Sequence, residues 1–155
     1  MRVQGKILSL TFIILFLVLF TGCGKTEDKT PWDVQEIWNA ISAAEDFPEM
    51  ISVPENRLGY MFGIEQKDYT QAMIAVSADS LRADEIWLIE AVDEAAARRM
   101  EEFAKIRLAQ KEEETRSYAP EQYRIVQEAK LELNGLRLIM IVSPSSEEIL
   151  EKLSG

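Results

Sequence analysis

The chain of 155 residues contains no histidine and only one cysteine, Cys23. Without histidine, Ser-His-Asp and Cys-His catalytic arrangements and all histidine-containing zinc sites are excluded. A single cysteine excludes an intramolecular disulfide and metal sites built from several thiolates. Glycine-rich phosphate loops, Ser-x-x-Lys motifs and EF-hand loops are absent as well. We therefore assign no catalytic residue and expect no cofactor and no dedicated metal site.

Basic residues are also scarce, because 17 Lys and Arg stand against 27 Asp and Glu, a net charge of −10. A nucleic-acid-binding surface needs Lys and Arg to replace phosphate counterions, so we exclude nucleic acid as a partner. With so many acids, pairs such as Asp84-Glu85 and Glu147-Glu148 arise by chance. For Asp84-Glu85 we favour a loop end followed by a strand start over an acid-base pair, because adjacent strand residues point to opposite faces.

The first 22 residues have the pattern of a secretory signal peptide. Arg2 and Lys6 precede the apolar run Ile7–Phe20, which is shorter than the roughly 20 residues of a membrane-spanning helix. Its length fits the hydrophobic region of a signal peptide, about 7–15 residues. The alternatives are an ordinary cleaved signal peptide that leaves a free cysteine, or an uncleaved anchor.

The residues Leu-Phe-Thr-Gly-Cys that end at Cys23 resemble a bacterial lipobox, although Phe20 stands where leucine is more usual. In a lipobox the thiol takes a diacylglyceryl group and the chain is cut just before the cysteine. We therefore predict three parts: a lipoprotein signal peptide (1–22), a lipidated Cys23 with a polar tether (23–30), and a single α+β domain (31–155). Two or three acyl chains suffice for stable anchoring. The protein would lie on the extracytoplasmic face of the cell membrane.

Apolar spacing in the remaining chain predicts helices and strands in the order α-α-β-β-α-α-β-β-α. Val34, Ile37, Trp38 and Ile41 lie on one face of a helix that begins either at Thr30, with Pro31 in its first turn, or at Asp33, which with Glu36 can form a capping box. A second, short helix should end at Gly63. The next predicted elements are two strands (70–78 and 85–92), a long helix from 94 towards 117, a short helix from 120, a hairpin and a last helix that begins at Ser143-Pro144-Ser145 and ends near Leu153. Three Glu-to-Lys or Glu-to-Arg pairs spaced i,i+4 should line the long helix: Glu94–Arg98, Glu101–Lys105 and Glu112–Arg116.

Asn134-Gly135 between two alternating apolar runs predicts a two-residue type I′ hairpin. In that register Leu133 opposes Leu136, and Glu132 opposes Arg137. The two hairpins together predict an α+β fold with one mainly antiparallel four-stranded sheet and helices packed on at least one face.

Trp87 and Ile89 lie in a strand that is apolar on both faces, since Ile86 and Leu88 alternate with them. One interpretation is a central strand covered on both sides. The other is an uncovered apolar patch, Trp87 and Ile89, that binds a protein or peptide partner.

Four segments occur in an order that resembles a known family: the lipobox, Gly59–Ile64 (Gly-Tyr-Met-Phe-Gly-Ile), Ala83–Ile86 (Ala-Asp-Glu-Ile) and Tyr118–Glu121 (Tyr-Ala-Pro-Glu). Together they resemble the bacterial lipoproteins grouped as domain of unknown function 4358. The resemblance covers most of the chain after the lipobox. It implies a small extracytoplasmic α+β domain, and it transfers no catalytic or binding residue because the family has no established activity.

Two functional hypotheses follow from the sequence. The first is a lipid-anchored binding or interaction module of the cell envelope, with the membrane as partner through its anchor and a protein or peptide as ligand. The second is an envelope hydrolase that uses carboxylates. A pocket with two carboxyl groups of raised pKa would favour the hydrolase, whereas an exposed apolar groove without clustered acids would favour the binding module. The sequence alone leaves enzymatic activity and oligomeric state open.

Overall fold

The computed structural model describes residues 32–44, 47–117 and 119–154, which belong to one unit that begins at Trp32. The predicted signal peptide, Cys23 and the tether lie outside the described residues. The described chain is an α+β domain with one antiparallel sheet. In chain order the elements are α2 (Val34–Ser42), β1 (Met50–Ser52), α3 (Glu55–Phe62), the 3-10 turn η1 (Gln66–Asp68), β2 (Tyr69–Ser77), β3 (Glu85–Ala91), α4 (Glu94–Arg116), α5 (Pro120–Gln127), β4 (Lys130–Asn134), β5 (Arg137–Val142) and α6 (Ser146–Ser154).

The sheet has five strands in the order β1-β2-β3-β5-β4, and all neighbours are antiparallel. The prediction of four strands was therefore wrong by one. The additional strand, β1, is only three residues long and pairs with the edge of β2. Pro48 and Pro54 lie close to its two ends. Three residues are too few to show a period of two, so no alternation marks this strand in the sequence.

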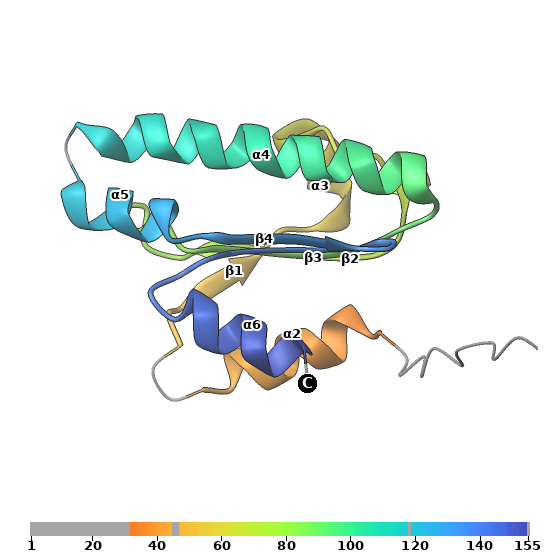
Figure 1. The fold of residues 1–155 in the computed structure, drawn as a ribbon, viewed down its shortest axis with the longest axis horizontal. Helices are drawn as coiled ribbons and strands as arrows, with labels where there is room; N and C mark the ends of the chain where they lie inside the picture. Colours follow the sequence, from red (N-terminus) through yellow and green to blue (C-terminus); the bar gives the residue numbers. More distant parts are fainter. Residues whose placement is uncertain (1–31, 45–46, 118, 155) are drawn as a thin grey trace, which may run out of the picture. The chain divides into compact units, whose positions relative to one another are not determined.

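Helices cover both faces of the sheet, as Figure 1 shows. α3, α4 and α5 lie on one face, and α2 and α6 lie on the other. The core is accordingly divided in two by the sheet, with Trp87, Ile89 and Met140 on the α4 side. Ile86 and Leu88 face the α2–α6 side. Because β3 lies at the centre of five strands, its apolar residues on both faces are covered.

The patch hypothesis for Trp87 and Ile89 is therefore wrong, since both side chains are fully buried at 0% exposure. The ring of Phe62 from α3 packs edge-on against Trp87, with ring centres 5.0 Å apart. The alternative interpretation, a central strand covered on both sides, is confirmed.

The helix boundaries follow the capping signals of the sequence. Oδ1 of Asp33 accepts hydrogen bonds from the first-turn amides of α2, and the carboxylate of Asp93 caps α4 in the same way. α3 ends at Gly63, whose φ of 75° is the left-handed conformation that glycine adopts at low cost. These three predictions are confirmed. All three i,i+4 ion pairs predicted along α4 are also present.

The β4–β5 hairpin forms, but with another turn and another register. Asn134 pairs with Arg137, so the two turn residues are Gly135 and Leu136. Among the described residues only glycines have positive φ, and Gly135 has φ 63°. That pattern is the one a type II′ turn requires, with glycine first, whereas type I′ needs positive φ at both turn residues.

The change of turn shifts the strand pairing by two residues, which leaves the faces unchanged. Leu131 and Leu133 still lie on the same face as Leu138. Glu132 opposes Ile139, however, so the predicted Glu132–Arg137 pair does not exist. Arg137 instead lies opposite Glu90 of β3, with 3.7 Å between Arg137 Nε and Glu90 Oε1.

Candidate binding site

The acid pairs of the sequence do not form a catalytic arrangement. Asp84 is almost fully buried and receives two hydrogen bonds from Arg82, of 2.8 and 3.3 Å. Glu147 is paired with Lys130, and Glu148 receives a hydrogen bond of 2.8 Å from Lys152. Each of these carboxylates has a cationic partner of its own. Among the described residues, no group of three or more Asp, Glu, Cys or His is placed to hold a metal ion.

Glu85 is the most unusual acid, because its side chain is completely buried beneath α4. Arg107 donates to both carboxylate oxygens, through Nε at 3.1 Å to each and through Nη2 at 2.8 Å to Oε2. Lys111 Nζ lies 2.8 Å from Oε2, and the indole Nε1 of Trp87 donates to Oε1 at 2.7 Å. The carboxylate therefore accepts from donors on three side chains.

This network holds Glu85 in its charged form. Burial by itself raises the pKa of a carboxyl group, but the hydrogen bond from Arg107 and the charge of Lys111 outweigh burial and lower the pKa of Glu85. A general acid near neutral pH needs the opposite shift. With both oxygens occupied by donors, Glu85 could act as a base or a metal ligand only after losing one of them. We interpret the Glu85 network as a structural element of the core.

The predictions from sequence missed this network, although the strand pattern carries a signal for it. Glu85, Trp87 and Ile89 alternate along β3, so all three must share one face of the sheet. A carboxylate in phase with two apolar residues of a central strand requires a buried cation. Arg107 and Lys111, one turn apart on α4, are the residues that supply it.

Two of the segments that resemble the family, Gly59–Ile64 and Ala83–Ile86, have residues at this network. Phe62, from Gly59–Ile64, packs against Trp87. Ala83, which opens the third segment, accepts a hydrogen bond from Lys111 Nζ at 2.9 Å through its carbonyl. Its amide donates to Oε1 of Gln122 at 2.8 Å, just after the fourth segment. These motifs therefore have a structural explanation.

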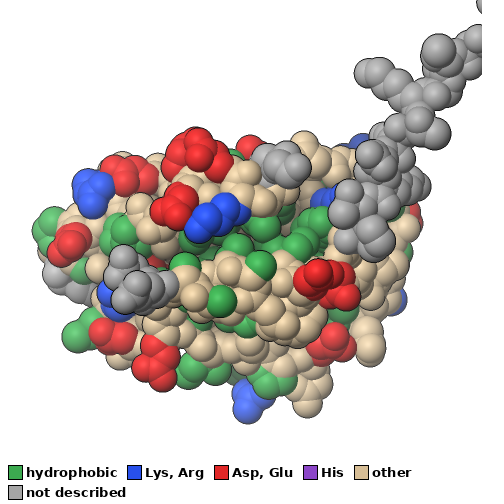
Figure 2. Space-filling model, turned by 90° about the horizontal axis from the view of Figure 1, so that it is seen from below, with side chains coloured by type: hydrophobic (Ala, Val, Ile, Leu, Met, Phe, Trp, Pro, Cys, Tyr) green, Lys and Arg blue, Asp and Glu red, His purple; other side chains and the backbone are tan. Residues whose placement is uncertain are grey.

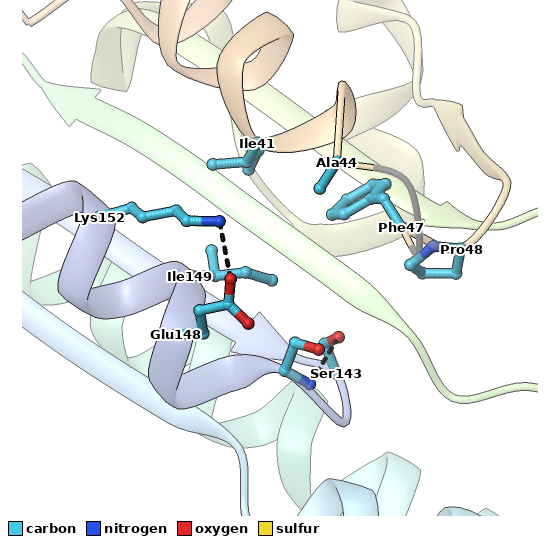
Figure 3. Close-up of a pocket in the computed structure, with 9 residues that line it drawn as sticks. Ile41, Ala44, Phe47, Pro48, Ser143, Glu148, Ile149 and Lys152 are labelled. Carbon is cyan, nitrogen blue, oxygen red and sulfur yellow. Dashed lines mark hydrogen bonds and ion pairs between the residues drawn. The ribbon is translucent and has the colours of Figure 1, made fainter.

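The opposite face carries a hollow between α2 and α6, with a volume of about 250 Å³. One wall consists of Ile41, Ala44, Phe47 and Pro48, from α2 and the chain that follows it. Figure 3 shows these residues across the hollow from α6. The wall on the α6 side has five lining residues: Ser143, Ser145, Glu148, Ile149 and Lys152. Five of the lining residues are apolar: Ile41, Ala44, Phe47, Pro48 and Ile149.

The walls of the hollow are held by the core beneath them. Ile41 and Ile149 are buried and belong to the same hydrophobic cluster as Leu88 of β3. The ring of Phe47 packs edge-on against Trp38, with ring centres 5.7 Å apart. These packing contacts within the domain hold the apolar walls of the hollow in place without a bound partner. Figure 2 shows hydrophobic side chains along a furrow on this face, with acidic side chains along both of its sides.

Comparison with known proteins places the chain in a family without giving it an activity. The family described as Domain of unknown function (DUF4358) matches residues 43–143, roughly two thirds of the chain, so the protein belongs to this family. The match runs from the end of α2 to the residue after β5 and includes all five strands. No curated protein and no solved structure matches the chain significantly.

Proposed function

We propose that the protein is a lipid-anchored binding module on the extracytoplasmic face of the cell membrane and that the hollow between α2 and α6 is its binding site. The observation that carries the binding part of the proposal is the composition of this hollow. Apolar side chains line it from two separate elements, and it is open on the surface of the domain. Ser143, Ser145, Glu148 and Lys152 add polar groups to this apolar surface, and a concave site that combines the two is the usual form of a ligand site.

The anchoring part of the proposal is supported by the sequence around Cys23. None of the described helices is both long and apolar enough to cross a membrane. If Cys23 is lipidated, eight residues separate it from Trp32, and the nine residue steps give a reach of at most about 32 Å. The binding site would then operate close to the membrane surface.

The start of the domain is fixed to the sheet, which would make such a tether effective. The carbonyl of Trp32 accepts a hydrogen bond of 2.8 Å from Gln71 Nε2, and the amide of Val34 donates to Oε1 of the same side chain at 3.2 Å. The guanidinium of Arg137 lies over the indole ring of Trp32, 5.5 Å from its centre. A pull on the tether would therefore act on the sheet rather than on α2 alone.

The carboxylate hydrolase gains no support from the geometry. The pKa values of Glu85 and Glu148 are both lowered, the first by its network and the second by Lys152. An acid catalyst needs a raised pKa. Glu148 also lies beside an apolar surface and not beside a second unpaired carboxylate. We therefore develop the binding module only.

The anchor is tested by substituting Cys23→Ser and following radiolabelled fatty acid and membrane fractionation in the producing cell. We expect the label to be lost and the protein to leave the membrane fraction. Cys23→Ser combined with Ser80→Cys is the matched control, because it restores a thiol far along the chain. Label in that control, or an unchanged result in Cys23→Ser, would contradict anchoring at Cys23.

The site is tested by photo-crosslinking in the cell. A photo-crosslinking amino acid placed at Lys152, beside the hollow, should give a discrete adduct. Adding Ala44→Phe, which fills the hollow from the exposed end of its other wall, should remove that adduct. The same amino acid at Tyr60, exposed on α3 on the opposite side of the sheet, is the control. An adduct that survives Ala44→Phe would show that the hollow is not the binding site.

A further inference from the structure

We propose that the hollow between α2 and α6 binds a basic peptide segment, which inserts apolar side chains between the two helices and places Lys or Arg against the acids beside them. This inference rests on the proposed function, because it names the chemical class of the ligand for the same site. Three observations carry it: the size of the hollow, the charges around it and the charge of the whole domain.

The size of the hollow favours an inserted side chain over a whole small molecule. Its volume of about 250 Å³ lies below the roughly 300–1,000 Å³ of pockets that enclose small ligands. Peptide and protein partners, by contrast, place one or two large apolar side chains in such hollows and leave the rest of the contact at the surface. Ile41, Phe47 and Ile149 supply the apolar surface that such a side chain would cover.

The two helices that flank the hollow carry four acids, Glu36, Glu147, Glu148 and Glu151, and one base, Lys152. On α6, Glu148 and Lys152 balance each other across 2.8 Å. On α2, Glu36 lies in the first turn and is exposed. Glu49 directly follows Pro48 of the wall. Both Glu36 and Glu49 are exposed, and within the described part of the chain neither takes part in an ion pair. A ligand with positive charges next to its apolar groups would complement this arrangement.

The net charge of the whole domain also favours a basic ligand. Cleavage before Cys23 removes Arg2 and Lys6, so 15 basic residues would face 27 acidic ones, a net charge of −12. A field of this sign speeds the approach of cationic partners and repels anionic ones. Acidic peptides and anionic lipid headgroups are therefore disfavoured as occupants of the hollow. A neutral apolar peptide would gain nothing from the acids.

The experiment compares three fluorescent peptides that share the same alternating Phe and Leu residues. The residues between them are Lys in the first peptide, Gln in the second and Glu in the third. Binding is measured by fluorescence anisotropy on the chain as the cell makes it, reconstituted in phosphatidylcholine nanodiscs, with empty nanodiscs as the blank. We expect the Lys peptide to bind most tightly and its affinity to fall as salt rises from about 0.05 M to about 0.5 M.

Two charge substitutions should shift the affinity in opposite directions. Glu148→Gln leaves Lys152 unpaired. It should therefore lower the affinity for the Lys peptide roughly two- to fivefold, the range expected for an exposed charge pair. Lys152→Gln leaves Glu148 unpaired and should raise the affinity for the same peptide by a similar factor. The matched control is Glu113→Gln, which removes an exposed negative charge from α4 on the other face of the sheet. It should leave the affinity unchanged.

The outcomes separate the two proposals. Equal binding of the three peptides, all abolished by Ala44→Phe, would overturn the basic ligand and keep the hollow as a binding site. Binding of the Lys peptide that Ala44→Phe does not change would overturn the basic ligand as an occupant of the hollow. Absence of binding by all three peptides would also overturn it, and the crosslink at Lys152 would then decide the proposed function independently.

Discussion

The indole nitrogen of Trp87 donates a hydrogen bond of 2.7 Å to the carboxylate of Glu85, two residues earlier on the same strand. Both side chains are completely buried on the α4 side of the sheet. A fully buried tryptophan of the core is therefore hydrogen-bonded to a charged group. This arrangement is stable only because Arg107 and Lys111 reach the same carboxylate from α4.

Removing the charge of Glu85 should destabilise the domain strongly. Glu85→Gln leaves Arg107 and Lys111 without their counter-charge in the core, and breaking a buried ion pair in this way costs roughly 3–5 kcal/mol. The free energy of unfolding in urea measures the effect. Glu112→Gln, which removes one half of an exposed pair on α4, is the control and should change it by no more than about 0.5 kcal/mol.

A second variant separates the loss of charge balance from the loss of hydrogen bonds. Replacing Glu85, Arg107 and Lys111 together by Met removes all three charges and keeps similar volumes. We expect this triple variant to unfold at a higher urea concentration than Glu85→Gln, because no unpaired charge is left in the core. A triple variant that is less stable than Glu85→Gln would contradict this explanation.

The network should also make stability depend on acid. The pKa of Glu85 in the folded chain lies below its ordinary value of 4.5. Its contribution to the free energy of unfolding is therefore complete above about pH 4.5 and is lost as the pH falls through the lower pKa of the folded state. Urea unfolding at several pH values should show the stability difference between the natural chain and Glu85→Gln shrinking below pH 4.5. A difference that stays constant down to pH 2 would contradict a lowered pKa.

Substituting alanine for two of the glycines should change the stability of the protein in opposite directions. Gly135 has φ 63° in the β4–β5 turn and its added Cβ would meet nothing, so Gly135→Ala costs only the backbone strain, about 1–2 kcal/mol. Gly59 lies inside α3, where an added Cβ makes an ordinary contact of 3.7 Å with the carbonyl oxygen of Ile64. Gly59→Ala should therefore stabilise the protein by about 0.5–1 kcal/mol. Thermal unfolding of both variants checks the pair, and equal effects would contradict the assigned turn.

Replacing the central apolar residues of β3 should abolish cooperative folding. Trp87→Ser and Ile89→Ser each remove a fully buried side chain, and even the milder change of Ile to Ala costs roughly 2–5 kcal/mol. Loss of the sigmoidal urea transition is the expected result. Leu81→Ser, at a side chain that is 81% exposed, is the control and should leave the transition unchanged. Cooperative unfolding of both β3 variants at the natural urea concentration would revive the exposed patch.

The sequence by itself determined the local structure, because the signals involved act over a few residues. Asp33 and Asp93 each have helix amides within hydrogen-bond reach, and Gly63 can take a left-handed conformation that ends α3. The alternation of Leu131, Leu133 and Leu138 determined which face of the hairpin is buried. The turn type was wrong because Asn-Gly favours type I′ only when no tertiary contact decides otherwise. Here Arg137 lies opposite both Asn134 and Glu90, which sets the register from the neighbouring strand.

Only the tertiary structure decided which surfaces are free. β1 is too short to carry a pattern of its own, and it is a strand because the edge of β2 supplies its hydrogen bonds. Burial of Trp87 depends on α3 and α4 packing over β3, a contact between segments far apart in the chain. The hollow arises in the same way, because Phe47 and Ile149 come together only when α2 and α6 settle on one face of the sheet. Such contacts depend on how the elements pack, and no local spacing of residues encodes them.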